Sequence, residues 1–184
     1  MVEQTKLEKY AELAVKVGIN VQPGQTLVVR APIFALEFIR LVAKKAYEHG
    51  AKHVHVDWSD EELTKTKFQL APEEAFHEYP EWIAKGYEQL AEKGAAFLSV
   101  TGVNPDLLKG INPDRIANAN RASGKALQGF RSYVTADKIS WSIVAVPSEG
   151  WAKKVFPDET PNRAVEKLWE AIFKATRIDT EDPV

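Results

Sequence analysis

Hydrophobic periodicity alternates along this chain between a helical repeat and short strand-like runs. Apolar residues recur at helical spacing from Leu7 to Val17, and Gly18 ends that pattern. Short β-branched or apolar runs bounded by glycine or proline follow it and are typical of strands. Strands are predicted over residues 26–31, 52–58, 95–102 and 140–147. Further helices are predicted over residues 34–45, 60–70, 80–93, 113–136 and 160–177.

This order of elements indicates the fold class. Strands that are separated by helices of a dozen or more residues form βαβ units and a mainly parallel sheet. Right-handed crossovers then place helices on both faces of that sheet. We therefore predict an α/β fold, a three-layer sandwich with a mainly parallel sheet of about four strands flanked by helices.

The strand over residues 52–58 differs from the other three. The runs "TLVVRA", "AAFLSV" and "SIVAVP" are almost continuously apolar, as strands buried on both faces are. In "KHVHVDW" the apolar side chains point to one face, whereas His53, His55 and Asp57 point to the other. A half-polar strand belongs at an edge, where it discourages pairing with another chain. The strand order 2-1-3-4 would place it there.

His53, His55 and Asp57 are also the candidate metal ligands of this sequence. Residues i and i+2 lie on one face about 7 Å apart, and imidazole is a common ligand of Zn²⁺. The remaining nitrogen donors, His49 and His77, lie in charged helical segments. We therefore favour the polar edge strand over the metal site.

Composition narrows the class of protein. The chain has 184 residues, of which 45% are hydrophobic and 27% charged, as in one soluble globular domain. A net charge of −2 does not favour binding to nucleic acid or to an anionic membrane. The absence of cysteine excludes disulfides and thiolate metal sites and suits the cytoplasm. Neither a signal peptide nor a membrane span is predicted.

Polar residues at the strand ends offer a second candidate site. Ser99, Thr101, Ser148 and Glu149 lie at or just beyond the carboxyl ends of strands, where open α/β sheets bind ligands. No histidine is near them in the sequence, and no GxSxG motif is present, so nucleophilic catalysis is not predicted.

Two further groups of residues are assigned to the surface and the core. Basic residues on the helical tract could meet phosphate or a carboxylate, but a solvated helix face is the favoured interpretation. These residues are Arg115, Arg121, Lys125 and Arg131. Trp141 and Trp151 are interpreted as core and interface anchors.

Three segments carry a resemblance to a known family. They are "LEKYAELAVKVGINVQPGQTLVV", "VAKKAYEHGAKHVHVDWSDEE" and "WSIVAVPSEGWAKKVFPDETPNRAVEKLWEAIFKATRID". In this order and spacing they resemble the N-terminal half of the thermophilic metallo-aminopeptidases, which include aminopeptidases II, T and S. The resemblance covers residues 1–184, and the last segment, with its paired tryptophans and "FPD", is the most diagnostic.

The resemblance implies an exopeptidase that releases N-terminal amino acids from peptides. In this family two divalent metal ions (Co, Zn or Mg) activate water and polarise the scissile carbonyl, with a carboxylate as general base. Members of the family are cytoplasmic homodimers of two-domain subunits about twice as long. Their metal ligands (two glutamates, two histidines, a tyrosine and an aspartate) come from the C-terminal half.

Residues 1–184 are therefore expected to be the N-terminal α/β domain, with the metal-binding catalytic domain lying outside this chain. We expect no catalytic residue, metal ligand or bound metal here, and no activity of the chain alone. An apolar patch should mark where the C-terminal catalytic domain of the same polypeptide packs. The candidate contacts are Pro147, Trp151, Val155, Phe156, Trp169 and Phe173.

Two alternatives of other classes stay open. The chain could be a stand-alone α/β binding module that holds a small anion or a peptide at the carboxyl edge of its sheet. It could also be a small hydrolase that uses His53, His55 and Asp57.

Overall fold

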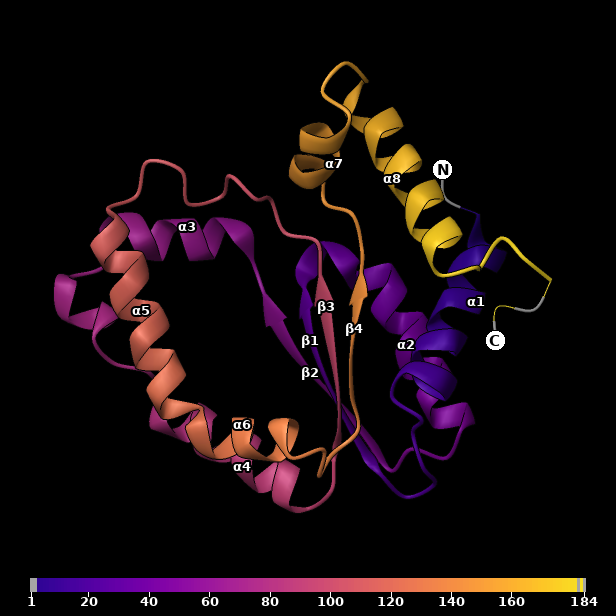
Figure 1. Cartoon of the computed structure of the whole chain (residues 1–184), viewed down its shortest axis with the longest axis horizontal. Helices are drawn as coiled ribbons and strands as arrows, with labels where there is room; N and C mark the ends of the chain where they lie inside the picture. The colour runs from indigo at the N-terminus through magenta and orange to yellow at the C-terminus, as the bar shows by residue number, and fades with distance from the viewer. Residues whose placement is uncertain (1–2, 182, 184) are drawn as a thin grey trace.

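Four strands form one parallel sheet in the computed structural model, which describes residues 3–181 and 183 (Figure 1). Their order is β2-β1-β3-β4. The strands are β1 (Thr26–Pro32), β2 (His53–Ser59), β3 (Ala96–Thr101) and β4 (Trp141–Ala145). The predicted fold class and strand order are confirmed, and the half-polar strand β2 lies at an edge.

Helices connect the strands and flank the sheet. They are α1 (Gln4–Leu13), α2 (Leu36–Glu48), α3 (Glu61–Leu70), α4 (Glu81–Glu92), α5 (Pro113–Ala126), α6 (Gln128–Thr135), α7 (Glu149–Val155) and α8 (Pro161–Ala175). Single helical turns occur at η1 (Ala14–Gly18), η2 (Ile33–Ala35) and η3 (Glu73–Phe76). Helix starts follow local chemistry, since Asp60 caps α3 by accepting a 2.8 Å hydrogen bond from the Leu63 backbone N–H. Within the described part of the chain, no helix has the length and apolar character that a membrane span requires.

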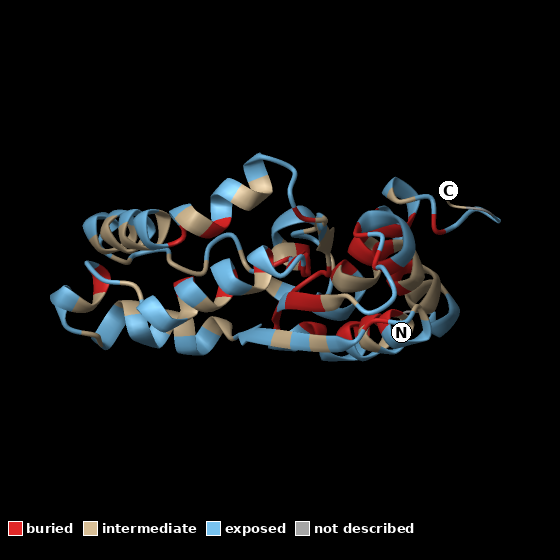
Figure 2. Ribbon diagram, turned by 90° about the horizontal axis from the view of Figure 1, so that it is seen from below, coloured by how far each residue is buried: buried red, intermediate tan, exposed pale blue. Residues whose placement is uncertain are grey.

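The two faces of the sheet are covered unequally. One face, with Leu27, Val29 and Leu98, packs against α1, α2 and α8 in the larger core. The other face packs Val28 and Phe97 against α4 and α6 in a smaller core. Helices α3 and α5 contain no buried residue and reach away from the sheet (Figure 1). Figure 2 shows the result, with buried residues concentrated around the sheet and the helices near the termini.

The tract over residues 113–136, predicted as one helix, is two helices that meet at Leu127. The Leu127 side chain is buried in the smaller core, so the chain turns there to bring α6 onto α4. Gly129 lies against the Glu88 carboxylate of α4, and an added Cβ would overlap it. Helix α7 was not predicted at all.

Strand β4 was predicted to be buried on both faces, and this prediction was wrong. Trp141 is 46% exposed and Ile143 is 60% exposed. Both residues belong to the second edge strand, on the face that α4 and α6 cover only in part. The interpretation of Trp141 as a core anchor is corrected for the same reason.

Tyr10 of α1 forms hydrogen bonds with outward-facing backbone groups of this edge strand. Its hydroxyl donates to the Ala145 carbonyl oxygen at 3.2 Å and accepts from the Ala145 N–H at 3.0 Å. The ring is buried and stacks on Phe38, with ring centroids 5.1 Å apart. Burial raises the pKa of the Tyr10 hydroxyl, so the group stays protonated and can donate at neutral pH.

Replacing Tyr10 by phenylalanine should lower the free energy of unfolding by about 1–3 kcal/mol, because the Ala145 N–H loses its partner. Urea denaturation followed by circular dichroism measures the change. Tyr133→Phe is the matched control, since the Tyr133 hydroxyl has no hydrogen bond to another described residue. Equal stability of the two variants would contradict this role for Tyr10.

Candidate functional site

An open cleft lies on the sheet face that carries the smaller core. Helices α4 and α6 cover Val28 and Phe97 in the first half of the strands, and the second half of the same face remains accessible. The opening there has a volume of about 520 Å³. We call it the sheet-face cleft; it is lined mainly by Arg30, Asp57, Trp58, Ser99, Thr101 and Ile143. Open parallel sheets bind ligands at this carboxyl end of their strands.

One row of side chains crosses all four strands inside the cleft. The strand register pairs Arg30 of β1 with Asp57 of β2 and with Ser99 of β3, and it pairs Ser99 with Ile143 of β4. In-register residues of parallel strands point to the same face. We call Asp57, Arg30, Ser99 and Ile143 the central row. From one edge of the sheet to the other, their side chains are a carboxylate, a guanidinium, a hydroxyl and an apolar group.

A third residue, Tyr87 of α4, contacts both charged residues of the central row. The Tyr87 hydroxyl of α4 donates a hydrogen bond to the Asp57 carboxylate. The Arg30 guanidinium lies over the Tyr87 ring, with its carbon 5.5 Å from the centroid. Arg30 forms no hydrogen bond or ion pair with another residue that the structure describes. Arg30 lines the sheet-face cleft.

The tyrosine that holds Asp57 is a stable donor. Burial raises the pKa of the Tyr87 hydroxyl well above its ordinary value, and the hydrogen bond to Asp57 and its negative charge raise it further. Arg30 opposes this rise without reversing it. Burial also raises the pKa of Tyr79 nearby. Both phenols keep their protons at neutral pH, so the Tyr87–Asp57 bond persists there.

The histidines of β2 do not join this arrangement as a metal site. His53 and His55 are exposed on the edge strand. His55 lines an opening of about 280 Å³ beside Trp82 and Ile83 of α4, and Asp57, which also borders this opening, bonds to Tyr87. Across the described residues, no three histidine, aspartate or glutamate side chains are placed to hold a metal ion together.

The structure separates the polar residues predicted at the strand ends. Ser99 and Thr101 line the sheet-face cleft. Ser148 is buried, and its hydroxyl accepts a 3.1 Å hydrogen bond from the Trp151 N–H as the N-cap of α7. Glu149 occupies the first turn of that helix and is exposed.

The basic residues of α5 and α6 do not form one solvated face. Arg115 forms an ion pair with Glu73 at 3.0 Å and donates to the Phe68 carbonyl oxygen at 2.9 Å. These contacts fasten α5 to η3 and to the end of α3. The interpretation as a solvated helix face therefore fails for Arg115; the exposed residues are Arg121, Lys125 and Arg131.

The central row includes a residue that the sequence analysis did not single out. Arg30 is the one exposed position of β1, and a lone arginine within the apolar run "TLVVRA" was the available signal. Tyr87 gave no comparable signal, because a tyrosine on an amphipathic helix usually belongs to the core.

The residues proposed as contacts with a further domain differ in their burial. Trp169 and Phe173 are 7% and 4% exposed and pack with Tyr10 in the larger core. Pro147 is buried as well. These three side chains are buried within the described chain, so little of their surface is accessible to a further domain. The more accessible candidates are Val155, which is exposed, and Trp151 and Phe156, which are partly exposed.

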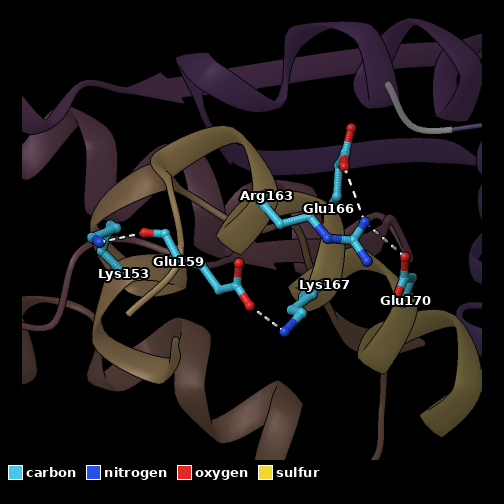
Figure 3. A network of polar contacts seen from close by, with 6 residues as sticks. All are labelled: Lys153, Glu159, Arg163, Glu166, Lys167 and Glu170. Carbon is cyan, nitrogen blue, oxygen red and sulfur yellow. Dashed lines mark hydrogen bonds and ion pairs between the residues drawn. The ribbon is translucent and has the colours of Figure 1, made fainter. Parts of the chain in front are cut away.

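Polar contacts fix the connection between α7 and α8 that carries Phe156 (Figure 3). The Lys153 ammonium donates to the Pro157 and Glu159 carbonyl oxygens at 2.8 and 2.6 Å. Lys167 of α8 pairs with the Glu159 carboxylate, and this contact holds the pKa of that carboxyl below its usual value. The Lys167 ammonium also lies 5.6 Å from the centre of the Phe156 ring.

Comparison with known proteins identifies the class of this α/β domain. Residues 3–184 match the model of a family described as thermophilic metalloprotease (M29). The chain therefore belongs to the M29 family of thermophilic metalloproteases.

Similar proteins show how much of a family member the chain represents. It is 56% identical over 181 residues to "Aminopeptidase 2" of Geobacillus stearothermophilus, which covers 98% of this chain and 44% of the relative. It is 42% identical over 178 residues to "Aminopeptidase T" of Thermus thermophilus, covering 97% of this chain and 44% of the relative. The solved structure of wild-type AmpT from Thermus thermophilus matches with a TM-score of 0.89 and 41% identity, over 95% of this chain and 44% of that one. The chain thus spans less than half the length of these relatives and corresponds to their N-terminal portion.

Proposed function

We propose that residues 1–184 are the N-terminal α/β domain of a two-domain metallo-aminopeptidase. The observation that carries this proposal is the match over residues 3–184 to a metalloprotease family, combined with coverage of only 44% of the relatives. The whole enzyme releases N-terminal amino acids from peptides with the help of two divalent metal ions, Co, Zn or Mg. It acts in the cytoplasm as a homodimer.

The metal ligands are proposed to lie in the remainder of the enzyme. The described residues do not fit a dinuclear site, since no three histidine, aspartate or glutamate side chains come together. The residues of this chain instead supply a rigid sheet, the sheet-face cleft, and a surface around Val155 for the C-terminal domain. The α7–α8 connection is held by Lys153 and Lys167, so this surface is presented in a fixed conformation.

Activity measurements test whether catalysis requires the C-terminal portion of the enzyme. The isolated chain should release no product from leucine p-nitroanilide with Co²⁺, Zn²⁺ or Mg²⁺ present, because activated water and the Lewis acid both come from the bound metals. Coexpression with the C-terminal portion of the enzyme should yield metal-dependent turnover, with each portion alone as the control. Metal-dependent turnover that follows the isolated chain through gel filtration would overturn the proposal.

A stand-alone binding module is the second candidate function. The sheet-face cleft, with its unpaired arginine at the carboxyl end of a parallel sheet, favours it. The coexpression experiment separates the two candidates, because a stand-alone module would gain no peptidase activity from the C-terminal portion.

A further inference from the structure

The central row contains opposite charges that do not neutralise each other. Arg30 and Asp57 are register partners on neighbouring strands, which lie about 4.8 Å apart. Asp57 nevertheless accepts from Tyr87, and no ion pair joins it to Arg30. One carboxylate oxygen of Asp57 has no hydrogen-bond partner among the described residues. The cleft therefore presents a cation and an anion side by side.

Arginine is an unusual residue for an inner strand of this sheet. Every neighbour of Arg30 along β1 from Leu27 to Pro32 is buried, and most of the strand is apolar. An apolar side chain would be typical of a strand with a neighbour on each side. Holding the guanidinium over the Tyr87 ring, with its donors unused, is an arrangement suited to an external anion.

We propose that the sheet-face cleft binds a free α-amino acid as its zwitterion. The planar guanidinium of Arg30 takes the α-carboxylate with two parallel hydrogen bonds, and the Ser99 hydroxyl adds a third. The unpaired oxygen of Asp57 accepts from the α-ammonium. Ile143 lines the same cleft and provides an apolar wall for an aliphatic side chain such as that of leucine.

The charge pattern disfavours other small anions. A phosphate dianion would be repelled by Asp57, which stands beside Arg30 in the central row. In a peptide the terminal ammonium and carboxylate are separated by one or more peptide units, so they do not match charges on adjacent strands. The idea that the bound amino acid is a product of peptide cleavage rests on the proposed function. The proposal that the cleft binds an amino acid does not depend on that function.

Calorimetric titration of the chain with leucine, in metal-free buffer, tests the proposal. Saturable binding of one leucine per chain is expected. N-acetylleucine lacks the ammonium, leucinamide lacks the carboxylate, and dileucine separates the two charges. Each should bind at least about tenfold more weakly than leucine, since each loses one charged hydrogen-bonding group or misplaces it.

Variants locate the site. Arg30→Gln and Asp57→Asn should each weaken leucine binding at least about tenfold, because each removes one charge. Asp57→Asn retains an oxygen for the Tyr87 hydroxyl, so it also serves as the variant that preserves the local fold. Arg131→Gln on α6 is the control, because Arg131 is exposed and outside the cleft, and it should bind as the parent chain does. Thermal unfolding of each variant confirms that it is folded.

The possible outcomes distinguish an amino-acid site from a peptide site and from no site at all. If leucine does not bind, or if folded Arg30→Gln and Asp57→Asn bind it as the parent does, the proposed site is wrong. If dileucine binds more tightly than leucine, the cleft is a peptide site. None of these results depends on peptidase activity, so the aminopeptidase proposal would stand or fall separately.

Discussion

The Gly102→Ala variant is expected to lose its stable fold, with the free energy of unfolding lowered by more than about 4 kcal/mol. Gly102 follows β3 with a φ of +139°, a conformation that glycine adopts and other residues rarely do. An added Cβ would overlap the Val146 carbonyl oxygen and lie 2.8 Å from the carbonyl carbon. Soluble yield, circular dichroism and urea denaturation measure the loss.

The surrounding backbone has little room to relieve this overlap. The Val146 N–H donates to the Thr101 carbonyl oxygen at 2.8 Å, and the Ser148 N–H donates to the Gly102 carbonyl oxygen at 3.2 Å. Moving the two segments apart would break these bonds at the end of β3 and β4. The matched control is Gly86→Ala in α4, where the added Cβ would meet no described atom within 4 Å beyond its chain neighbours and the backbone of its own helix. That variant should be unchanged or more stable by up to about 1 kcal/mol, and a Gly102→Ala protein as stable as Gly86→Ala would refute the argument.

The Trp169→Ala variant is expected to destabilise the isolated chain by about 3–5 kcal/mol. Trp169 is buried in the larger core, with its ring stacked on Phe173 at 5.2 Å and its edge toward Tyr10 at 6.2 Å. Truncation would leave a cavity among aromatic side chains that are held by α1 and the sheet. Urea denaturation of the isolated chain measures the effect.

This result would separate a core residue from an interface residue. Trp82 of α4 is 77% exposed, and Trp82→Ala should change stability by no more than about 0.5 kcal/mol. If Trp169→Ala left the isolated chain unchanged and weakened only its association with the C-terminal portion, Trp169 would be an interdomain contact and not a core residue. Val155→Ser offers a comparison, because Val155 is exposed and should have little effect on the isolated chain.

The candidate site was only partly predictable. The carboxyl ends of the strands were the expected location, and Ser99 and Thr101 do line the cleft there. Asp57 was singled out as a polar residue of β2, but its bond to Tyr87 could not be anticipated. Arg30 was overlooked because the run that contains it is otherwise apolar. Hydrogen bonds between residues this far apart in the chain leave no periodic signal.

The sequence by itself determined the types and order of the strands and the edge position of β2. These features follow from periodicity within each segment, because a repeat of two or of 3.6 residues decides which side chains share a face. Tertiary structure decided which faces were covered. Helices α4 and α6 pack over only half of one sheet face, which exposes Ile143 and leaves Arg30 accessible. Helix α8 packs against α1 and buries Trp169. Burial depends on partners supplied by distant segments, so the same apolar pattern can mark a core or a free surface until the chain is packed.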